Sequence, residues 1–468
     1  MFAIVPILLE VIFVLLKPQE LYEVLTTIQP LYTLPALIAL GFVFDAGRFG
    51  IGAARMFAAP YLRFSLFFFG WCLLTVMIRA PGQLTAQAIL FGTSVLMALS
   101  IAHCVQTWRL YQIVAGTLLA LTLLLSFVGT HQATAPFRCH WIDPIDRTVQ
   151  HYDGHPCSGP EAEAECIQDE DDHEKTWVCE HAGLMGTASV SGRIRFRGNL
   201  EDPNELALTV AIGLPFAIAF LQRKKSFLRL LLLLASLALV ISCIFYSQSR
   251  GGQLVLLVVL GTYFMRRFGW KIGMVAGGAA AVPLLILASM SGRSSSEAEG
   301  SSEERIECLQ IGLDLVKHSP VFGVGKGQFG EYHFLTAHNS YVLAAAETGL
   351  IGFAAWSAVI YLAVKIPLSG LRALQGLEGP EAEEARTWAT AMLASMAGAV
   401  VGSFFLSFSF HAILWIYIGL SGALAGVLRR QLPDWRVRLS PKEMGLIVVG
   451  NIALLGAIFA YTKVRGGG

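Results

Sequence analysis

The sequence contains little charge, and neither sign is in excess. Only 14% of the 468 residues are charged, whereas soluble domains carry about 25% charged residues. This composition excludes an ordinary soluble enzyme. The 34 Lys and Arg residues are balanced by 33 Asp and Glu residues, so the chain has no positive field of the kind that attracts nucleic acid. We therefore expect no nucleic-acid partner.

The motifs of several soluble enzymes are also missing. The sequence has no G-x-S-x-G elbow of serine hydrolases and no H-E-x-x-H metal helix. Residues 325–330, GKGQFG, match G-x-G-x-x-G, but no strand pattern precedes them. Gly327 also stands where a phosphate loop needs Ser or Thr. We expect neither dinucleotide nor ATP binding here.

Long apolar runs dominate the chain instead. Hydrophobic residues make up 55% of it, its mean hydropathy is +0.60, and the apolar blocks have about the 17–25 residues that cross a bilayer as a helix. The predicted fold is all-α, a polytopic transmembrane helical bundle of about 12–13 spans with two long periplasmic loops. The thirteen predicted spans lie near residues 2–16, 30–45, 61–78, 84–105, 110–130, 204–222, 226–246, 252–265, 271–290, 340–364, 387–408, 411–428 and 443–461.

The charges of the short connections predict the orientation. With the N-terminus in the cytoplasm, the inner connections are rich in Lys and Arg, and the short outer ones hold only Lys17, Arg79 and Arg250. No cation precedes the first apolar run and no small-residue cleavage site follows it, so we expect an uncleaved first span. Both long hydrophilic segments then face outward.

These two segments divide the chain into five parts. The predicted parts are 1–130 with spans 1–5, 131–203 as a cysteine-rich loop, 204–290 with spans 6–9, 291–339 as a second loop, and 340–468 with spans 10–13. Polar side chains gather in and beside the two loops, so we expect the functional site there.

Half of the eight cysteines lie in the first loop, at Cys139, Cys157, Cys166 and Cys179. Four cysteines in an outer loop predict two disulfides, with three possible connectivities, in an oxidising compartment such as a periplasm. Six histidines in the same loop leave zinc as an alternative, but the close C-x-x-C pairing of zinc sites is absent. We favour disulfides and expect no metal.

Two arginine-containing segments flank predicted spans at the outer boundary. Arg250 follows the seventh span within SRGG, where small residues allow other groups to approach closely; the alternative is an interfacial anchor. In RIRFRGN, Arg193, Arg195 and Arg197 alternate with apolar residues, so an extended backbone would place the three cations on one side. Such a stripe suits a diphosphate or an anionic headgroup. Pairing with the nearby acidic loop is an equal alternative.

Residues of the second loop lead toward the tenth span. A predicted amphipathic helix begins at Arg305, and its apolar face suits the membrane interface. Pro320 ends it, a glycine-rich turn follows, and His338 and Asn339 stand at the start of the next span, where a helix N-terminus favours anions. Glu347 lies nine residues further on. A carboxylate at that depth is either functional or a lock between helices.

Taken in order, these motifs resemble a known family. The sequence contains R-G-N-x-x-D-P-N-E-x-A from Arg197, SRGG at 249–252, PVFGVGKGQF from Pro320, and HNSYVLAAAETGLIG from His338. This combination, over about residues 190–365, resembles the O-antigen ligase and polymerase superfamily of integral membrane glycosyltransferases. The cysteine-rich loop and a thirteenth span depart from the shared pattern.

The resemblance implies a reaction and a set of site residues. Members transfer a glycan from an undecaprenyl-diphosphate carrier to an acceptor hydroxyl at the periplasmic face of the bacterial inner membrane, without cofactor or metal. Here Arg250 and Arg305 would bind the diphosphate, Arg197 would be a third contact, and His338 would be the catalytic base. Asn339, Tyr341 and Glu347 would support His338 or bind sugar.

The acceptor and the wider class of protein stay open. A ligase delivers the glycan to a lipid A core sugar, whereas a polymerase delivers it to a second carrier-linked glycan, and we favour the ligase. The bond would form with inversion at the anomeric carbon. A transporter of lipid-linked oligosaccharides would have a similar number of spans, but the sequence shows no convincing internal repeat. A scaffold that binds a partner through the cysteine-rich loop would leave the outer arginines and His338 unexplained.

Overall fold

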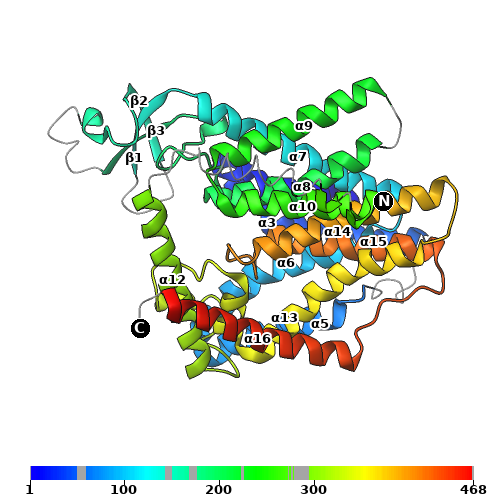
Figure 1. Cartoon of the computed structure of the whole chain (residues 1–468). Helices are drawn as coiled ribbons and strands as arrows, with labels where there is room; N and C mark the ends of the chain where they lie inside the picture. The colour runs from blue at the N-terminus through cyan, green and yellow to red at the C-terminus, as the bar shows by residue number, and fades with distance from the viewer. Residues whose placement is uncertain are drawn as a thin grey trace.

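The computed structural model of the chain describes residues 2–49, 59–142, 150–167, 176–222, 226–271, 273–275, 278 and 295–465. Helices account for most of this part (Figure 1). They are α1 (Ile4–Leu16), α2 (Glu23–Ile28), α3 (Pro30–Phe49), α5 (Leu62–Arg79), α6 (Leu84–Cys104), α7 (Trp108–Thr134), α8 (Pro203–Gln222), α9 (Phe227–Tyr246), α10 (Arg250–Phe268), α12 (Ser295–His318), α13 (Ser340–Ala373), α14 (Pro380–Gly402), α15 (Ala412–Gln431) and α16 (Pro441–Arg465).

The predicted helical membrane bundle is confirmed. Eight helices in the described part are long and apolar enough to cross a membrane: α5, α6, α7, α8, α9, α13, α15 and α16. Helix α1 and the apolar part of α3 are shorter, and α10 and α14 are less hydrophobic than these eight. The predicted span at 271–290 lies almost wholly outside the described residues.

Two predicted segments of the second half have other bounds. The span expected over 387–408 is α14, which begins at Pro380 and ends at Gly402. Residues 403–408 form a turn instead, because side chains at the start of α13 bond the carbonyl groups of Phe404 and Leu406. The amphipathic helix expected from Arg305 is α12, which begins ten residues earlier, at Ser295.

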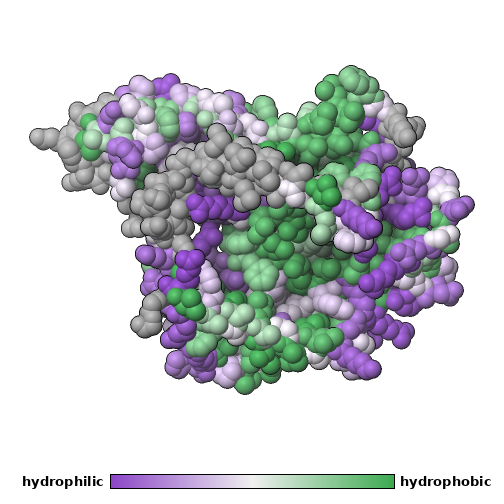
Figure 2. All heavy atoms as spheres, in the orientation of Figure 1, coloured by the Kyte–Doolittle hydropathy of each residue, from purple (hydrophilic) through white to green (hydrophobic). Residues whose placement is uncertain are grey.

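Burial separates inner helices from lipid-facing ones. In α15 and α8, 83% and 78% of the apolar window is buried, whereas in α9 and α16 only 22% and 11% is buried. Because α9 and α16 are nevertheless the most hydrophobic along with α7, their exposed apolar side chains are suited to lipid rather than water. Figure 2 shows a broad hydrophobic region between hydrophilic ends.

The two ends of the chain lie at opposite ends of the bundle (Figure 1). Helix α1 begins beside Asp45 of α3, whose carboxylate accepts from the backbone N–H groups of Phe2 and Ala3. Helix α16 ends against α12, where Gln310 donates to the carbonyl of Thr462 and Lys317 lies 4.6 Å from the ring centre of Phe459.

The cysteine-rich segment contains a small β-sheet that the sequence analysis did not predict. Strands β1 (Phe137–Ile142), β2 (Gln150–Pro156) and β3 (Thr176–His181) form an antiparallel sheet in the order β2-β1-β3. It projects from one end of the bundle (Figure 1). The cysteine-rich segment is thus a folded unit attached to a helical membrane protein.

Candidate active site

The starts of α8 and α10 are joined at the end of the bundle that carries the sheet. Asp202 caps α8 by accepting from the N–H of Asn204 at 2.7 Å. The Asn204 amide oxygen accepts in turn from the Ser249 hydroxyl at 2.7 Å, and Ser249 caps α10 by accepting from Gly252. This short chain of bonds fixes two helix starts next to each other.

Arg250 is the first residue of α10 and its side chain is exposed. The two glycines after it are needed for packing. A Cβ at Gly251 would lie 3.2 Å from the Phe405 side chain, and one at Gly252 would lie 2.5 Å from the Ala207 Cβ. The small residues of SRGG therefore allow α10 to pack closely on α8 and on the turn after α14, while the guanidinium remains available to a ligand.

His338 is held in an unusual backbone conformation immediately before α13. Its φ angle is +45°, in the left-handed region that histidine adopts more readily than most residues. Asn339 caps α13 by accepting from the N–H groups of Tyr341 and Val342, and its amide donates to the Phe404 carbonyl at 3.2 Å. Because the cap and the turn after α14 fix the neighbouring residue, the half-buried His338 imidazole has a defined place.

Charged groups from other segments surround His338. Burial and the charges of Arg305 and His333 lower its pKa, whereas Asp202 and Glu304 act in the opposite direction. Arg305 and Glu304 belong to α12, and Asp202 precedes α8. The fold thus brings His338 and Arg305, which lie 33 residues apart in the sequence, into one electrostatic environment.

Helix α12 packs on the protein rather than only on a membrane surface. Leu313 and Val316 of its predicted apolar face are buried, and the helix contacts α13 and α16. Arg305 is half-buried in the middle of this helix and not at its start. Its position is therefore fixed by helix packing, which suits a group that must hold a ligand in one place.

The arginine stretch before α8 is extended, with Ile194 and Phe196 buried as the alternation predicts. Its three guanidinium groups all donate to backbone carbonyls: Arg193 to Ser247 at 3.0 Å, Arg195 to Ala188 at 3.0 Å, and Arg197 to Met185. These bonds attach the stretch to the segments around it.

Arg197 and Arg195 have different charged neighbours. Burial lowers the pKa of Arg197, and its acidic neighbour is Glu20, after α1. Burial also lowers the pKa of Arg195, and Glu180, Glu201 and Asp202 counteract this effect. Asp202 also acts on His338, so Arg195 and the histidine share a charged neighbour. The groups beside Arg197 are Met185 and Glu20, and neither is among those that act on the pKa of His338.

The remaining predicted residues, Tyr341 and Glu347, make bonds within the protein. The Tyr341 hydroxyl donates to the Val400 carbonyl at 2.9 Å and its ring packs on Phe404. Glu347 is buried and accepts from the Phe329 N–H at 3.2 Å. This bond links α13 to the glycine-rich loop and not to a neighbouring span, which differs from the bond between helices that the structural interpretation expected.

That loop joins α12 to α13 and is attached to a break in α13. The break lies at Gly349, where φ is +66° and ψ is −178°. The carbonyls of Ala346 and Glu347 accept from the N–H groups of Val324 and Gly325 at 2.9 and 3.0 Å. The ETG sequence therefore marks a place where a helix opens and receives the loop.

The opposite side of the loop is attached to α5 and α6. Arg79 donates to the Gly323 carbonyl at 3.1 Å and to the Ser319 hydroxyl at 3.0 Å. The buried ammonium of Lys326 donates to the Gln87 side chain and lies 5.3 Å from the Phe410 ring centre. In a phosphate loop this lysine would contact the nucleotide, whereas here its bond to Gln87 attaches the loop to α6.

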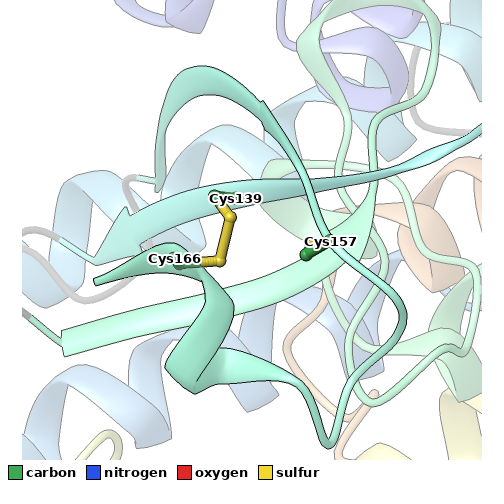
Figure 3. A group of neighbouring side chains, drawn as sticks. All are labelled: Cys139, Cys157 and Cys166. Atoms are coloured by element: carbon green, nitrogen blue, oxygen red, sulfur yellow. A yellow bond between two sulfur atoms is a disulfide. The ribbon is translucent and has the colours of Figure 1, made fainter. Parts of the chain in front are cut away.

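The four cysteines of the sheet form two disulfides, Cys139–Cys166 and Cys157–Cys179. Figure 3 shows the first bond, with Cys157 near it. Cys139, Cys157 and Cys166 are the one group of possible metal ligands in the described part of the chain, and disulfide formation removes the thiolates that a zinc ion requires. The preference for disulfides over zinc agrees with this geometry.

Sequence reasoning did not assign a site role to Asp202, Glu304 or His333. Asp202 caps α8 and also acts electrostatically on His338, as do the other two. His333 is buried and lies 3.6 Å from the Cys308 sulfur. Their spacing along the chain carries no periodic signal, although Asp202 does lie within one of the motifs.

Comparison with known proteins supports the resemblance. Residues 235–357 match a family model described as O-Antigen ligase. The matched segment includes Arg250, Arg305 and His338 but not Arg197. No curated protein matches the chain.

Proposed function

We propose that this chain, which carries an O-antigen ligase domain over residues 235–357, transfers a glycan from an undecaprenyl-diphosphate carrier to an acceptor hydroxyl. The reaction takes place at the periplasmic face of the bacterial inner membrane. The observation that carries the proposal is the placement of His338 with Arg305 and Asp202 at one end of the bundle, next to the start of α10 where Arg250 stands.

The two arginines suit the leaving group. As the bond between the anomeric carbon and the diphosphate oxygen breaks, its electron pair moves to the diphosphate. Guanidinium groups pair with phosphate oxygens through two parallel bonds and stabilise this charge best where water is limited. Arg305 is half-buried on a packed helix and Arg250 is at a helix start, so both are anchored at their backbones. Arg197, held by Met185, is a weaker candidate.

His338 suits the acceptor. The hydroxyl oxygen of the acceptor bonds to the anomeric carbon while the imidazole takes the hydroxyl proton. A lowered pKa keeps the imidazole neutral at pH 7, which a general base requires. Attack opposite the diphosphate inverts the anomeric carbon. Asn339 and the turn after α14 position His338, and Tyr341 and Glu347 support that part of the bundle.

The product distinguishes a ligase from a polymerase. We would incubate the purified chain in nanodiscs with an undecaprenyl-diphosphate oligosaccharide, with and without a lipid A core acceptor, and resolve the products by mass. We expect a product only with the core acceptor. A ladder on the carrier alone would instead indicate a polymerase, and no product with several donors would favour a transporter.

The His338→Ala variant tests the base. We expect transfer to be abolished while donor binding and protein yield stay close to those of the parent chain, because the side chain lies at the surface of the site. Tyr332→Ala is the matched control, since Tyr332 is an exposed residue of the same loop. Normal turnover by His338→Ala would exclude this histidine as the base.

A further inference from the structure

A polar cavity lies at the end of the bundle opposite the candidate active site. Its volume is about 560 Å³, and it is lined by Phe220, Gln222, Arg229, Arg267, Pro380, Glu383, Glu384 and Thr387. These residues belong to the last turn of α8, the first turn of α9, the last turns of α10 and the first turns of α14. The size falls within the range of small-ligand sites, about 300–1,000 Å³.

The cavity is separate from the candidate active site. Helix α8 begins beside Asp202 and ends at the cavity with Gln222, and its 20 residues span about 30 Å. Helix α10 likewise begins at Arg250 and ends near Arg267. The two sites therefore lie at opposite membrane boundaries, and what binds here does not depend on the proposed function.

The cavity borders a surface that faces lipid. Phe227, Leu228 and Leu230, the neighbours of Arg229 in α9, are 82%, 62% and 52% exposed. Such a row of exposed apolar side chains is stable only against acyl chains. The opening beside Arg229 is thus at the depth of headgroups, and a bound lipid can extend its chains along α9.

Among the described residues that line the cavity, the charges are balanced in number. Arg229 and Arg267 supply two guanidinium groups, and Glu383 and Glu384 supply two carboxylates. The Arg267–Glu383 contact is 4.0 Å long between half-exposed side chains, so it contributes little stability by itself. Within the described part of the chain, the guanidinium of Arg229 is bonded to no carboxylate. Glu384 already accepts from Gln112 at 2.5 Å, which leaves Glu383 as the more available acid.

We propose that this cavity binds a phospholipid with a phosphoethanolamine headgroup. The lipid phosphate pairs with Arg229 and Arg267, and its primary ammonium donates to Glu383, so both lipid charges are matched. A phosphocholine headgroup has no N–H to donate to a carboxylate, and a phosphoglycerol headgroup has no cation at all. The site is therefore expected to discriminate among lipids of similar chains.

The test measures lipid retention by the full chain. We would exchange the purified protein into an equal mixture of phosphatidylethanolamine, phosphatidylcholine and phosphatidylglycerol and count bound lipids by native mass spectrometry. We expect phosphatidylethanolamine to be retained preferentially, and Arg229→Gln and Glu383→Gln each to reduce that preference about tenfold. Arg430→Gln, an exposed arginine at the end of α15, is the matched control and keeps the preference.

Three results would overturn the proposal. They are equal retention of the three lipids, preference for phosphatidylglycerol, and an unchanged preference in both cavity variants. Melting temperatures of all variants, measured in one detergent, show that each is folded. A last experiment adds soluble phosphoethanolamine to the protein. Displacement of the bound lipid by this compound supports headgroup recognition. Binding of the soluble compound by protein that retains no lipid contradicts a lipid site.

Discussion

His338 illustrates how neighbouring residues set the properties of a single side chain. Its imidazole is half-buried, its backbone is in the left-handed region, and the charges of Arg305 and Asp202 act on its pKa in opposite directions. Arg305 favours the neutral form and Asp202 favours the protonated form. Substitution of Arg305 or Asp202 is therefore a direct way to shift the pKa of the histidine without replacing it.

The pH dependence of transfer is the first prediction. A general base is active when neutral, so the transfer rate falls as the pH falls through the pKa of the base. This fall is the acid limb of the pH profile. Because the pKa of His338 is lowered, the acid limb lies below the ordinary histidine value of about 6.5. Arg305→Gln removes a charge that lowers this pKa, so the limb moves to higher pH. Asp202→Asn, which keeps the helix cap, moves it to lower pH. Profiles of kcat/KM against pH measure both shifts, and equal movement of the two variants in one direction would refute the assignment.

Arg250 gives a second prediction at this scale. Arg250→Lys keeps the charge but loses the planar fork that binds two phosphate oxygens. We expect the transfer rate to fall about 100-fold, as when one donor of an anion-stabilising site is removed. Because Arg250 is exposed, the melting temperature should stay unchanged. Arg430→Lys serves as the control; full activity of Arg250→Lys would show that only a positive charge is needed there.

At the scale of elements, the active end depends on a loop attached to a broken helix. The loop between α12 and α13 bonds the free carbonyls at the break, Glu347 accepts from it, and Arg79 holds its outer edge. A Cβ at Gly349 would lie 2.1 Å from the Val321 carbonyl oxygen. The break can form only with glycine, because both the φ angle and the contact exclude a side chain.

Gly349→Ala is therefore expected to destabilise the protein strongly. Backbone strain and the clash together should cost about 2–5 kcal/mol, which thermal unfolding in one detergent would report as a lower melting temperature. Gly261→Ala in α10 is the control, since no heavy atom lies within 4 Å of its added Cβ; there alanine should leave stability unchanged or raise it slightly. Equal stability of the two variants would contradict this account of the break.

At the scale of the whole molecule, one end of the bundle carries the sheet, α12 and the loop, and the other end carries the polar cavity. The four cysteines outside the sheet are all buried, and those in the sheet are paired. The parent chain thus offers no accessible thiol, so single exposed cysteines can report the orientation directly.

We predict opposite labelling of two such variants. Tyr332→Cys, in the exposed loop near His338, should react with a membrane-impermeant maleimide added to intact spheroplasts. Arg430→Cys, at the end of α15, should react only after the membrane is opened. The parent chain measures background. Labelling of Arg430→Cys alone in intact spheroplasts would reverse the proposed orientation and remove the periplasmic site.

The sequence by itself determined the helical membrane fold and most helix positions, because the length of an apolar run is set by the bilayer and needs no tertiary information. It also placed Asn339 at the start of a helix, although the structure makes this residue the cap rather than part of the first turn. It missed the end of α14 at Gly402, where bonds from Asn339 and Ser340 to the following turn replace the helix.

Only the tertiary structure decided which polar residues share a site. The disulfide connectivity and the sheet depend on contacts between segments that no spacing specifies. The grouping of Asp202, Glu304 and His333 around His338, and the placement of Arg197 beside Glu20, depend on how α1, α8 and α12 pack. Helix formation is local, whereas the electrostatic neighbours of a side chain are brought to it by residues distant in the chain.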